Sequence, residues 1–344
     1  MKFGSRKLTN LALQGGGSHG AFTWGVLDRL LEDGRLDFDG ISGASAGAIN
    51  AVVLAYGLMV DGRDGARQAL ADFWGAVGAK SLFDPLVANV FETLGEIPNG
   101  EPSPMLRALL ALTRFFSPYE LNPLDLNPLR DIVTEQIDFE WLRRECTVKL
   151  FVATTQVRTG KLRIFETREL TADMLLASAC LPSLHQAVEI KGEEYWDGGY
   201  SANPAIYPLF YQCRAQDIIM VLLHPLSHPH RTRTAQEIWG RVTELSFSSP
   251  FLREMQLITQ AKERAEDAWF VFGTLERRLR TTNFHVIEAD ELMTQLSPHS
   301  KINALQPFLE FLRDQGRNRA GAWLDQHYSN VTVRSSAKLK ELFS

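Results

Sequence analysis

The sequence contains only three cysteines among 344 residues, and none of them belongs to a C-x-x-C pair. Their wide separation argues against a disulfide framework or a cysteine zinc site and favours buried thiols in a reducing compartment. The most apolar helical stretch, 46–60, is shorter than the roughly 20 residues that a membrane span needs. The basic N-terminus lacks the apolar run of a secretory signal. We therefore expect a cytoplasmic protein.

A surplus of positive charge is also missing. The 36 Lys and Arg residues are outnumbered by 41 Asp and Glu residues, and the net charge of −5 gives no reason to expect a nucleic-acid partner. Apolar residues make up 45% and charged residues 22%, which is typical of a soluble globular protein. The length allows one large domain with additions, or two domains.

Glycine, by contrast, is concentrated in two turns near the N-terminus, GGGSHG at 15–20 and GASAG at 43–47. Each turn follows an apolar run that predicts a strand and precedes an apolar helical pattern. The second turn places Ser45 at the centre of Gly-x-Ser-x-Gly, between Gly43 and Gly47. This pattern is typical of a nucleophile elbow, a sharp strand-to-helix turn that exposes a serine hydroxyl and needs permissive glycines.

The first turn offers the backbone N–H groups of Gly15, Gly16 and Gly17 with no bulky side chain in front of them. Such donors at the start of a helix suit a developing oxyanion. A nucleophile and an oxyanion cradle this close in sequence indicate acyl transfer.

A serine nucleophile needs a base, and none of the eight histidines lies in a distinctive motif. A third turn with glycines, Asp197-Gly198-Gly199, follows an aromatic strand pattern. Burial against Tyr195 and Trp196 of this strand would raise the pKa of Asp197 above its ordinary value of about 3.9. The alternative interpretation of this turn is an ordinary Asp-Gly hairpin.

Strand and helix patterns alternate along the chain, which predicts a sheet covered by helices on both faces. Strands are expected at 8–13, 38–41, 149–156, 161–165, 217–223 and 284–288, with a hairpin at 188–196. Helices are expected at 21–32, 46–60, 66–77, 171–179, 235–247, 251–266, 267–280 and 305–326. The interval 224–234 is polar and proline-bearing, and we interpret it as a linker.

The proline-rich interval 81–127 contains apolar pieces that fit either a pair of core helices or a helical cap whose apolar face admits a lipid chain. We predict a catalytic domain at 8–223 with this interval as a cap-like insertion. A mainly helical C-terminal extension is expected at 235–344.

The three glycine-bearing motifs, in this order, resemble the patatin-like phospholipase family, of the bacterial type. The run ASACLPSLHQAVEIKGEEYWDGGYSANP at 177–204 also resembles the segment that leads into the catalytic aspartate of that family. The resemblance implies a three-layer α/β/α hydrolase with Ser45 as nucleophile and Asp197 as base, without a histidine. It implies an oxyanion hole from Gly15, Gly16 and Gly17, and motif roles for five further glycines: Gly20, Gly43, Gly47, Gly198 and Gly199.

The resemblance implies no metal and no organic cofactor. It implies acyl lipids as substrates, including phospholipids, lysophospholipids and neutral lipids, and hence contact with a lipid surface. Where the family commonly carries Arg or Lys, this chain has His19. We expect this histidine to be partly charged near neutral pH and to make the site sensitive to pH.

The leading hypothesis is therefore a serine hydrolase of acyl lipids. Three alternatives stay open: an acyltransferase or an esterase for another acyl substrate such as a polyester, an inactive lipid-binding module, and a conventional α/β-hydrolase with His285 as a late base. The headgroup, the acyl length and the oligomeric state are not determined by the sequence.

Overall fold

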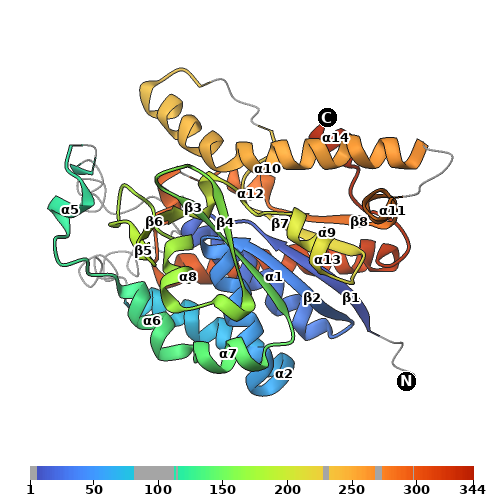
Figure 1. The fold of residues 1–344 in the computed structure, drawn as a ribbon, viewed down its shortest axis with the longest axis horizontal. Coiled ribbons are helices and arrows are strands. Elements are labelled where there is room, and N and C mark those ends of the chain that lie inside the picture. The colour runs from blue at the N-terminus through green and yellow to red at the C-terminus, as the bar shows by residue number, and fades with distance from the viewer. Residues whose placement is uncertain (1–5, 81–111, 114, 228–231, 268–272, 297) are drawn as a thin grey trace.

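The computed structural model describes residues 6–80, 112–113, 115–227, 232–267, 273–296 and 298–344 (Figure 1). Its strands form one eight-stranded sheet in the order β5-β6-β3-β2-β1-β7-β8, with β4 paired to β3. The neighbours β3-β2-β1-β7-β8 are parallel, whereas β4 and β6 run antiparallel to β3. The strands are β1 (Lys7–Leu13), β2 (Leu36–Ala44), β3 (Lys149–Gln156), β4 (Leu162–Glu166), β5 (Val188–Ile190), β6 (Glu193–Asp197), β7 (Asp217–Leu222) and β8 (Asn283–Glu288).

Helices cover both faces of this sheet, which confirms the predicted α/β/α sandwich. Because alternate residues of a strand face opposite sides, Leu11 and Leu13 of β1 pack into one core and Ala12 into the other. The first core is closed by α1 (Gly20–Asp33), α2 (Ala46–Ala79) and α13 (Gln306–His327). The second is closed by α9 (Tyr207–Gln212), α10 (Ala235–Asp267), α11 (Thr274–Thr281) and α14 (Leu339–Phe343).

Shorter helices connect these elements within the described residues. They are α5 (Pro118–Leu121), α6 (Pro128–Gln136), α7 (Phe139–Glu145), α8 (Ala172–Ser178) and α12 (Asp290–Met293), with the 3-10 turns η1 (Gly17–His19), η2 (Thr167–Glu169), η3 (Gly198–Tyr200), η4 (Pro298–Ile302) and η5 (Tyr328–Asn330).

The C-terminal segment shares the sheet and one helical layer with the N-terminal part, because β8 extends the sheet from β7 and α13 lies along α1. The two helices approach closely at two glycines. A Cβ atom on Gly25 would overlap the carbonyl of Arg313, and one on Gly316 would overlap the carbonyl of Phe22. The division into domains at 223 and 235 stays a prediction.

This close approach predicts a position-specific effect on stability. We expect Gly316→Ala to lower the free energy of unfolding by about 1–3 kcal/mol, because an added methyl group must push α13 away from α1. The control is Gly321→Ala in the same helix, where the nearest heavy atom to a Cβ is 3.6 Å away. There the higher helix propensity of alanine should stabilise by up to about 1 kcal/mol. Urea unfolding compares the two, and equal effects would contradict close packing.

The helical intervals predicted in the C-terminal segment are confirmed in part, and the structure corrects two of their boundaries. The intervals 235–247 and 251–266 form one helix, α10, which continues through Pro250. Tertiary packing overrides the break that proline favours, since Phe247 packs on Tyr200 and Phe251 is buried on the other side of Pro250. The predicted helix 267–280 begins only at Thr274, after an extended Gly273, and 268–272 lies outside the described residues.

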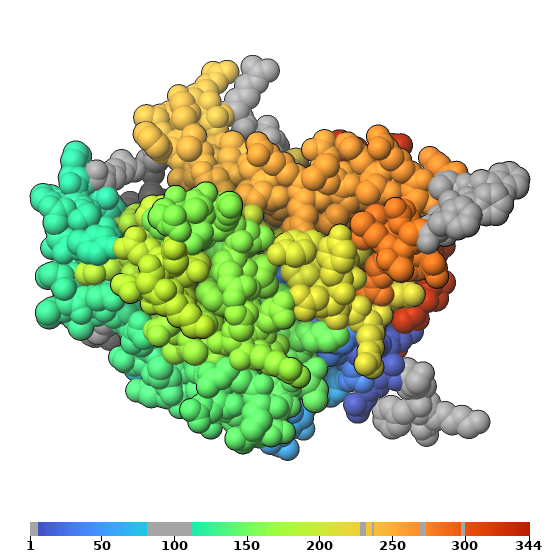
Figure 2. Space-filling view, viewed as in Figure 1, coloured from blue at the N-terminus to red at the C-terminus, as the bar shows by residue number. Residues whose placement is uncertain are grey.

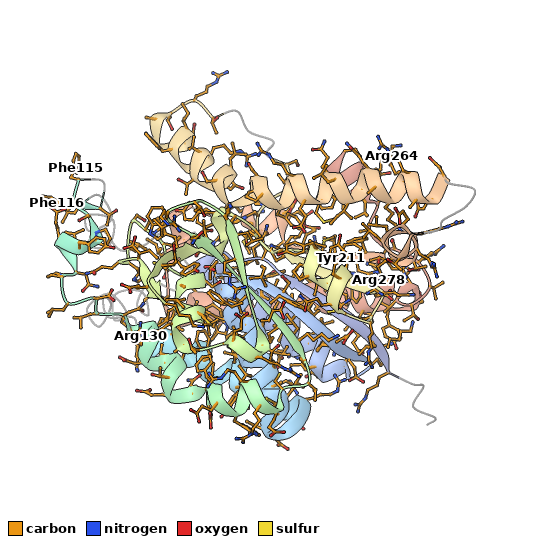
Figure 3. The ribbon with its side chains drawn as sticks, in the orientation of Figure 1. Phe115, Phe116, Arg130, Tyr211, Arg264 and Arg278 are labelled. Atoms are coloured by element: carbon orange, nitrogen blue, oxygen red, sulfur yellow. The ribbon has the colours of Figure 1, made fainter. Side chains whose placement is uncertain are left out.

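The predicted helices 46–60 and 66–77 are confirmed as the two halves of α2, separated by non-helical Asp61 and Gly62. The cap predicted at 81–127 lies largely outside the described residues, as does 228–231 of the predicted linker. The described end of the cap interval carries exposed apolar side chains. Phe115 is 82% exposed and, like Phe116, lies at the outer tip of the molecule in Figure 3.

Candidate active site

Ser45 stands at the turn between the carboxyl end of β2 and the first residue of α2. Its backbone has φ 52° and ψ −130°, a left-handed conformation that costs a non-glycine residue roughly 1–3 kcal/mol. The turn is held by its N–H, which donates to the carbonyl of Ser178 at 3.1 Å and to Ser178 Oγ at 3.0 Å. The sharp strand-to-helix turn is the local geometry that the Gly-x-Ser-x-Gly pattern predicts, and the role of Ser45 as a nucleophile stays a prediction.

The glycines that flank Ser45 are required by close packing. A Cβ atom on Gly47 would overlap the carbonyl oxygen of Leu13 at the end of β1, and one on Gly43 would lie 2.6 Å from the backbone nitrogen of Ala48. A similar limit applies beside Asp197, where a Cβ on Gly198 would overlap the carbonyl of Ala153. Substitution at any of these positions would therefore move the elbow or the aspartate loop.

Asp197 ends β6 and is fully buried. Its Oδ1 accepts a hydrogen bond from the N–H of Gly199 at 2.7 Å, while Oδ2 has no hydrogen-bond partner among the described residues. Burial raises the pKa of the carboxyl to about 7, against the opposing effects of the Gly199 N–H and the Ser45 hydroxyl. The structure therefore brings Ser45 and Asp197 together, with a carboxyl whose pKa suits a general base near neutral pH.

The first glycine turn lies directly against the elbow. A Cβ atom on Gly15 would be 2.5 Å from the carbonyl oxygen of Ala44 and 2.7 Å from Ser45 Cβ. The N–H of Gly15 already donates to Asn203 Oδ1 at 2.6 Å, so the expectation that Gly15 is an oxyanion donor needs correction. The N–H groups of Gly16 and Gly17 make no hydrogen bond to a described residue, and they stay the predicted donors.

Two polar residues that sequence reasoning missed hold this turn. These residues are Asn203 and Gln14. The side chain of Asn203 accepts the N–H of Gly15, and its backbone carbonyl accepts a hydrogen bond from Gln14 Nε2 at 3.3 Å. Gln14 Oε1 in turn accepts the N–H groups of Leu223 at 2.6 Å and His224 at 2.8 Å, just beyond β7. All these groups are buried, and an unpaired buried amide would be costly. No local pattern marks these contacts, because their partners are about two hundred residues apart.

His19 is buried behind the glycine turn, with Nε2 at 2.6 Å from Ser300 Oγ. Burial and the nearby charge of Lys301 lower the pKa of His19 to about 3. The imidazole is therefore neutral at neutral pH. This finding corrects the expectation that His19 is partly charged and makes the site sensitive to pH.

His285, the base of the conventional α/β-hydrolase hypothesis, belongs to a different cluster. Its Nε2 is 2.9 Å from Asp217 Oδ1 and its Nδ1 is 2.9 Å from Ser336 Oγ. Asp217 pairs with Thr9 at the start of the parallel strands, whereas Ser45 follows their carboxyl ends. At about 3.3 Å per residue, Asp217 and Ser45 are more than about 12 Å apart. His285 therefore does not reach Ser45, and the hypothesis of a conventional α/β-hydrolase with this base is wrong.

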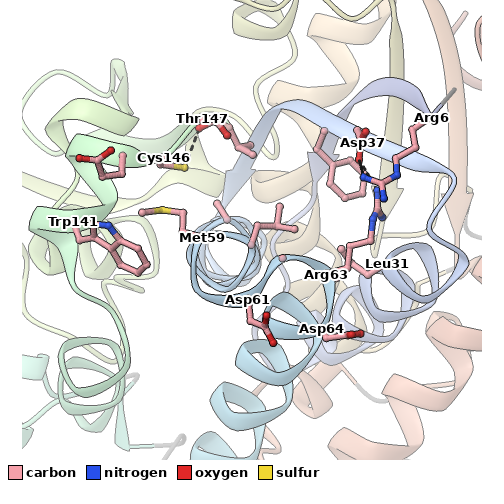
Figure 4. A pocket seen from close by; sticks show the side chains of 16 residues that line it. Arg6, Leu31, Asp37, Met59, Asp61, Arg63, Asp64, Trp141, Cys146 and Thr147 are labelled. Atoms are coloured by element: carbon pink, nitrogen blue, oxygen red, sulfur yellow. Dashed lines mark hydrogen bonds and ion pairs between the residues drawn. The ribbon is translucent and has the colours of Figure 1, made fainter.

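A hollow of about 820 Å³ also lies at the opposite end of the sheet from Ser45 (Figure 4). It is bordered by Met59, Trp141 and Asp37, the last of which lies at the start of β2. The Asp37 carboxylate forms ion pairs with Arg6 and Arg63. It is not part of the candidate site. In the described part of the chain, no three His, Cys, Asp or Glu side chains are grouped so that they could hold a metal ion.

A second hollow, of about 590 Å³, lies between the β3–β4 turn and α10, which adjoin in Figure 2. Tyr200 and Ser201, which follow the Asp197 loop, form one wall, and Val242 and Leu245 of α10 form another. None of the helices that the structure describes has the length and apolarity to cross a membrane.

Fold and site together define an α/β/α sandwich with a strained serine at a strand-to-helix turn beside a buried carboxyl. Residues 11–210 match the sequence model of the family described as patatin-like phospholipase, and the chain belongs to this family. Membership supports lipid acyl hydrolase activity. Among curated proteins, none matches the sequence.

Two solved structures are similar to this chain. VipD from Legionella pneumophila is 14% identical, with 99% of this chain and 73% of that chain covered and a TM-score of 0.39. A chain of the heterodimeric ExoU–SpcU complex from the type III secretion system of Pseudomonas aeruginosa is 17% identical, with 94% of this chain and 52% of that chain covered and a TM-score of 0.37.

Proposed function

We propose that the protein hydrolyses carboxylic ester bonds of phospholipids or other acyl lipids, with Ser45 as nucleophile and Asp197 as its base. The observation that carries the proposal is the pairing of a strained elbow serine with a fully buried carboxyl whose pKa is raised to about 7. At neutral pH about half of the Asp197 carboxyls would be ionised and able to accept a proton.

In the proposed mechanism, Ser45 Oγ attacks the ester carbonyl carbon while its proton passes to Asp197. The N–H groups of Gly16 and Gly17 donate to the oxyanion of the tetrahedral intermediate. Collapse of this intermediate breaks the ester C–O bond, and the departing alcohol takes the proton from Asp197. Water then loses a proton to Asp197 and attacks the carbonyl carbon of the acyl-enzyme. Collapse of this second tetrahedral intermediate breaks the bond to Ser45 Oγ, which takes the proton from Asp197, and the fatty acid is released.

The proposal includes a peripheral contact with a lipid surface and a cytoplasmic location. Exposed apolar side chains near α5 and on α10 support the contact, because side chains of this kind can insert into a lipid surface. Around α5, Leu124 is 77% exposed and Leu126 is 67% exposed, in addition to Phe115. On the N-terminal half of α10, Trp239 is 65% exposed.

The test is labelling with a fluorophosphonate probe, followed by hydrolysis of p-nitrophenyl esters of graded chain length. We expect the wild-type protein to be labelled and hydrolysis to rise with acyl length. A folded wild-type protein that is neither labelled nor active would favour the inactive lipid-binding module. Faster product formation with an acceptor alcohol, accompanied by a new ester, would favour the acyltransferase alternative.

A further inference from the structure

The 3-10 turn η4, from the C-terminal segment, contacts the glycine turn through two consecutive residues. Ser300 Oγ is hydrogen-bonded to His19 Nε2 at 2.6 Å. The backbone carbonyl of Lys301 lies against Gly17, where a Cβ atom would overlap it. Gly17 has φ 60°, the left-handed conformation that favours glycine. The predicted oxyanion donors are therefore packed against a segment almost three hundred residues away in sequence.

The contact between His19 and Ser300 is buried and does not depend on ionisation. Ser300 has no exposed surface and His19 is 3% exposed. The imidazole stays neutral because burial and the charge of Lys301 lower its pKa to about 3. Among the described residues, Nδ1 of His19 has no hydrogen-bond partner, so Ser300 makes the one hydrogen bond that orients the ring. Phe308 adds an edge contact at 6.5 Å between ring centroids.

The orientation of His19 affects the N–H groups of Gly16 and Gly17, because these two glycines and His19 belong to the same turn. Gly17 to His19 form η1, and the N–H of His19 donates to the carbonyl of Gly16 at 3.2 Å. That carbonyl and the N–H of Gly17 belong to the same peptide group, so a shift of His19 rotates this N–H. Oxyanion donors act only within about 2.7–3.1 Å of the developing charge, and a misplacement of about 1 Å costs up to about a hundredfold in rate.

We propose that Ser300 is a positioning residue that acts through His19 to hold the N–H groups of Gly16 and Gly17 toward the oxyanion. This inference rests on the proposed function, since it needs an oxyanion at this turn. It adds that the C-terminal segment completes the site. Neither residue is proposed to transfer a proton, since the buried ring, with its pKa lowered to about 3, is a weak base.

The experiment compares Ser300→Ala with Ser336→Ala in the full-length protein. Both changes remove a hydroxyl bonded to a buried histidine, but Ser336 serves His285 at the other end of the strands. We expect Ser300→Ala to lower kcat on a p-nitrophenyl ester by about 10- to 100-fold with KM changed less than about twofold. The fluorophosphonate labelling rate should fall in parallel. Ser336→Ala should leave kcat unchanged.

Two further variants separate positioning from folding. Ser300→Cys keeps a side chain of similar size with a weaker donor, and we expect the same selective loss of kcat. In a double-mutant cycle, His19→Asn and Ser300→Ala should be strongly non-additive in kcat, because each change removes the hydrogen bond between His19 and Ser300. If a folded Ser300→Ala variant keeps the wild-type kcat and labelling rate, the inference is overturned. The same holds if kcat falls only as the folded fraction falls.

These outcomes differ from failure of the proposed function. A wild-type protein that is folded but neither labelled nor active would overturn the proposed function and this inference with it. An active wild-type protein with an unaffected Ser300→Ala variant would overturn this inference alone.

Discussion

Ser45→Ala is expected to abolish ester hydrolysis, with kcat reduced by about a thousandfold or more and fluorophosphonate labelling lost. The large effect follows from the role of the hydroxyl, because no acyl-enzyme can form without it. The backbone should change little, since the N–H of Ser45 keeps both of its hydrogen bonds to Ser178. Steady-state kinetics with a p-nitrophenyl ester and intact-protein mass spectrometry after labelling give the result.

The matched control is Ser42→Ala, three residues earlier in β2. Ser42 is fully buried, and its Oγ has no hydrogen-bond partner among the described residues. Removing this hydroxyl leaves no partner unsatisfied, so activity should stay within about twofold and stability should be unchanged or slightly higher. Labelling that persists in Ser45→Ala would show that another residue is the nucleophile.

The sequence was sufficient to predict features that depend on neighbouring residues. The elbow at Ser45 was predictable because a strand pattern, Gly-x-Ser-x-Gly and an apolar helix follow one another directly. The layered sheet followed from the alternation of strands and helices. The bend in α2 was visible too, since both flanking helices were predicted and the gap between them contains Gly62.

Contacts between distant segments could not be predicted in this way. The Gly15–Asn203 bond joins residues 188 positions apart, and the His19–Ser300 bond joins residues 281 positions apart. The first contact removes Gly15 from the predicted donors. Burial of His19, together with the charge of Lys301, keeps the imidazole neutral, although its ordinary pKa would allow partial charge. In the same way, packing on both sides of Pro250 overrides the local preference that predicted two helices.

Asp197→Asn is expected to abolish activity and at the same time to stabilise the fold. Activity should fall about a thousandfold, because asparagine cannot accept the proton of Ser45. The side chain can still accept the N–H of Gly199 through its carbonyl oxygen, so the loop should be retained. The double variant Ser45→Ala/Asp197→Asn should lose little more activity than either single variant, since the two residues act as a unit.

The gain in stability follows from the raised pKa. The pKa of Asp197 rises from an ordinary value near 3.8 to about 7 in the folded protein. Between about pH 4 and pH 7 the unfolded chain therefore binds fewer protons than the folded protein at this site, and the free energy of unfolding falls as pH rises. The ionised carboxyl above pH 7 destabilises the wild-type fold, and asparagine removes this effect. We expect a gain of about 1–4 kcal/mol at pH 8 and none at pH 4.

Asp217→Asn provides the contrast that tests this argument. Asp217 is also buried, but its Oδ1 lies 2.9 Å from His285 Nε2 and accepts the N–H of Thr332 at 2.8 Å. A carboxylate with such partners is stabilised where it lies, so its replacement should lower the free energy of unfolding. Urea unfolding of both variants at pH 4 and pH 8 measures the difference.

Wild-type kcat/KM should rise with pH through about 7, because the proposed base must be ionised. A flat pH profile together with destabilisation by Asp197→Asn would show that Asp197 is a structural carboxylate like Asp217.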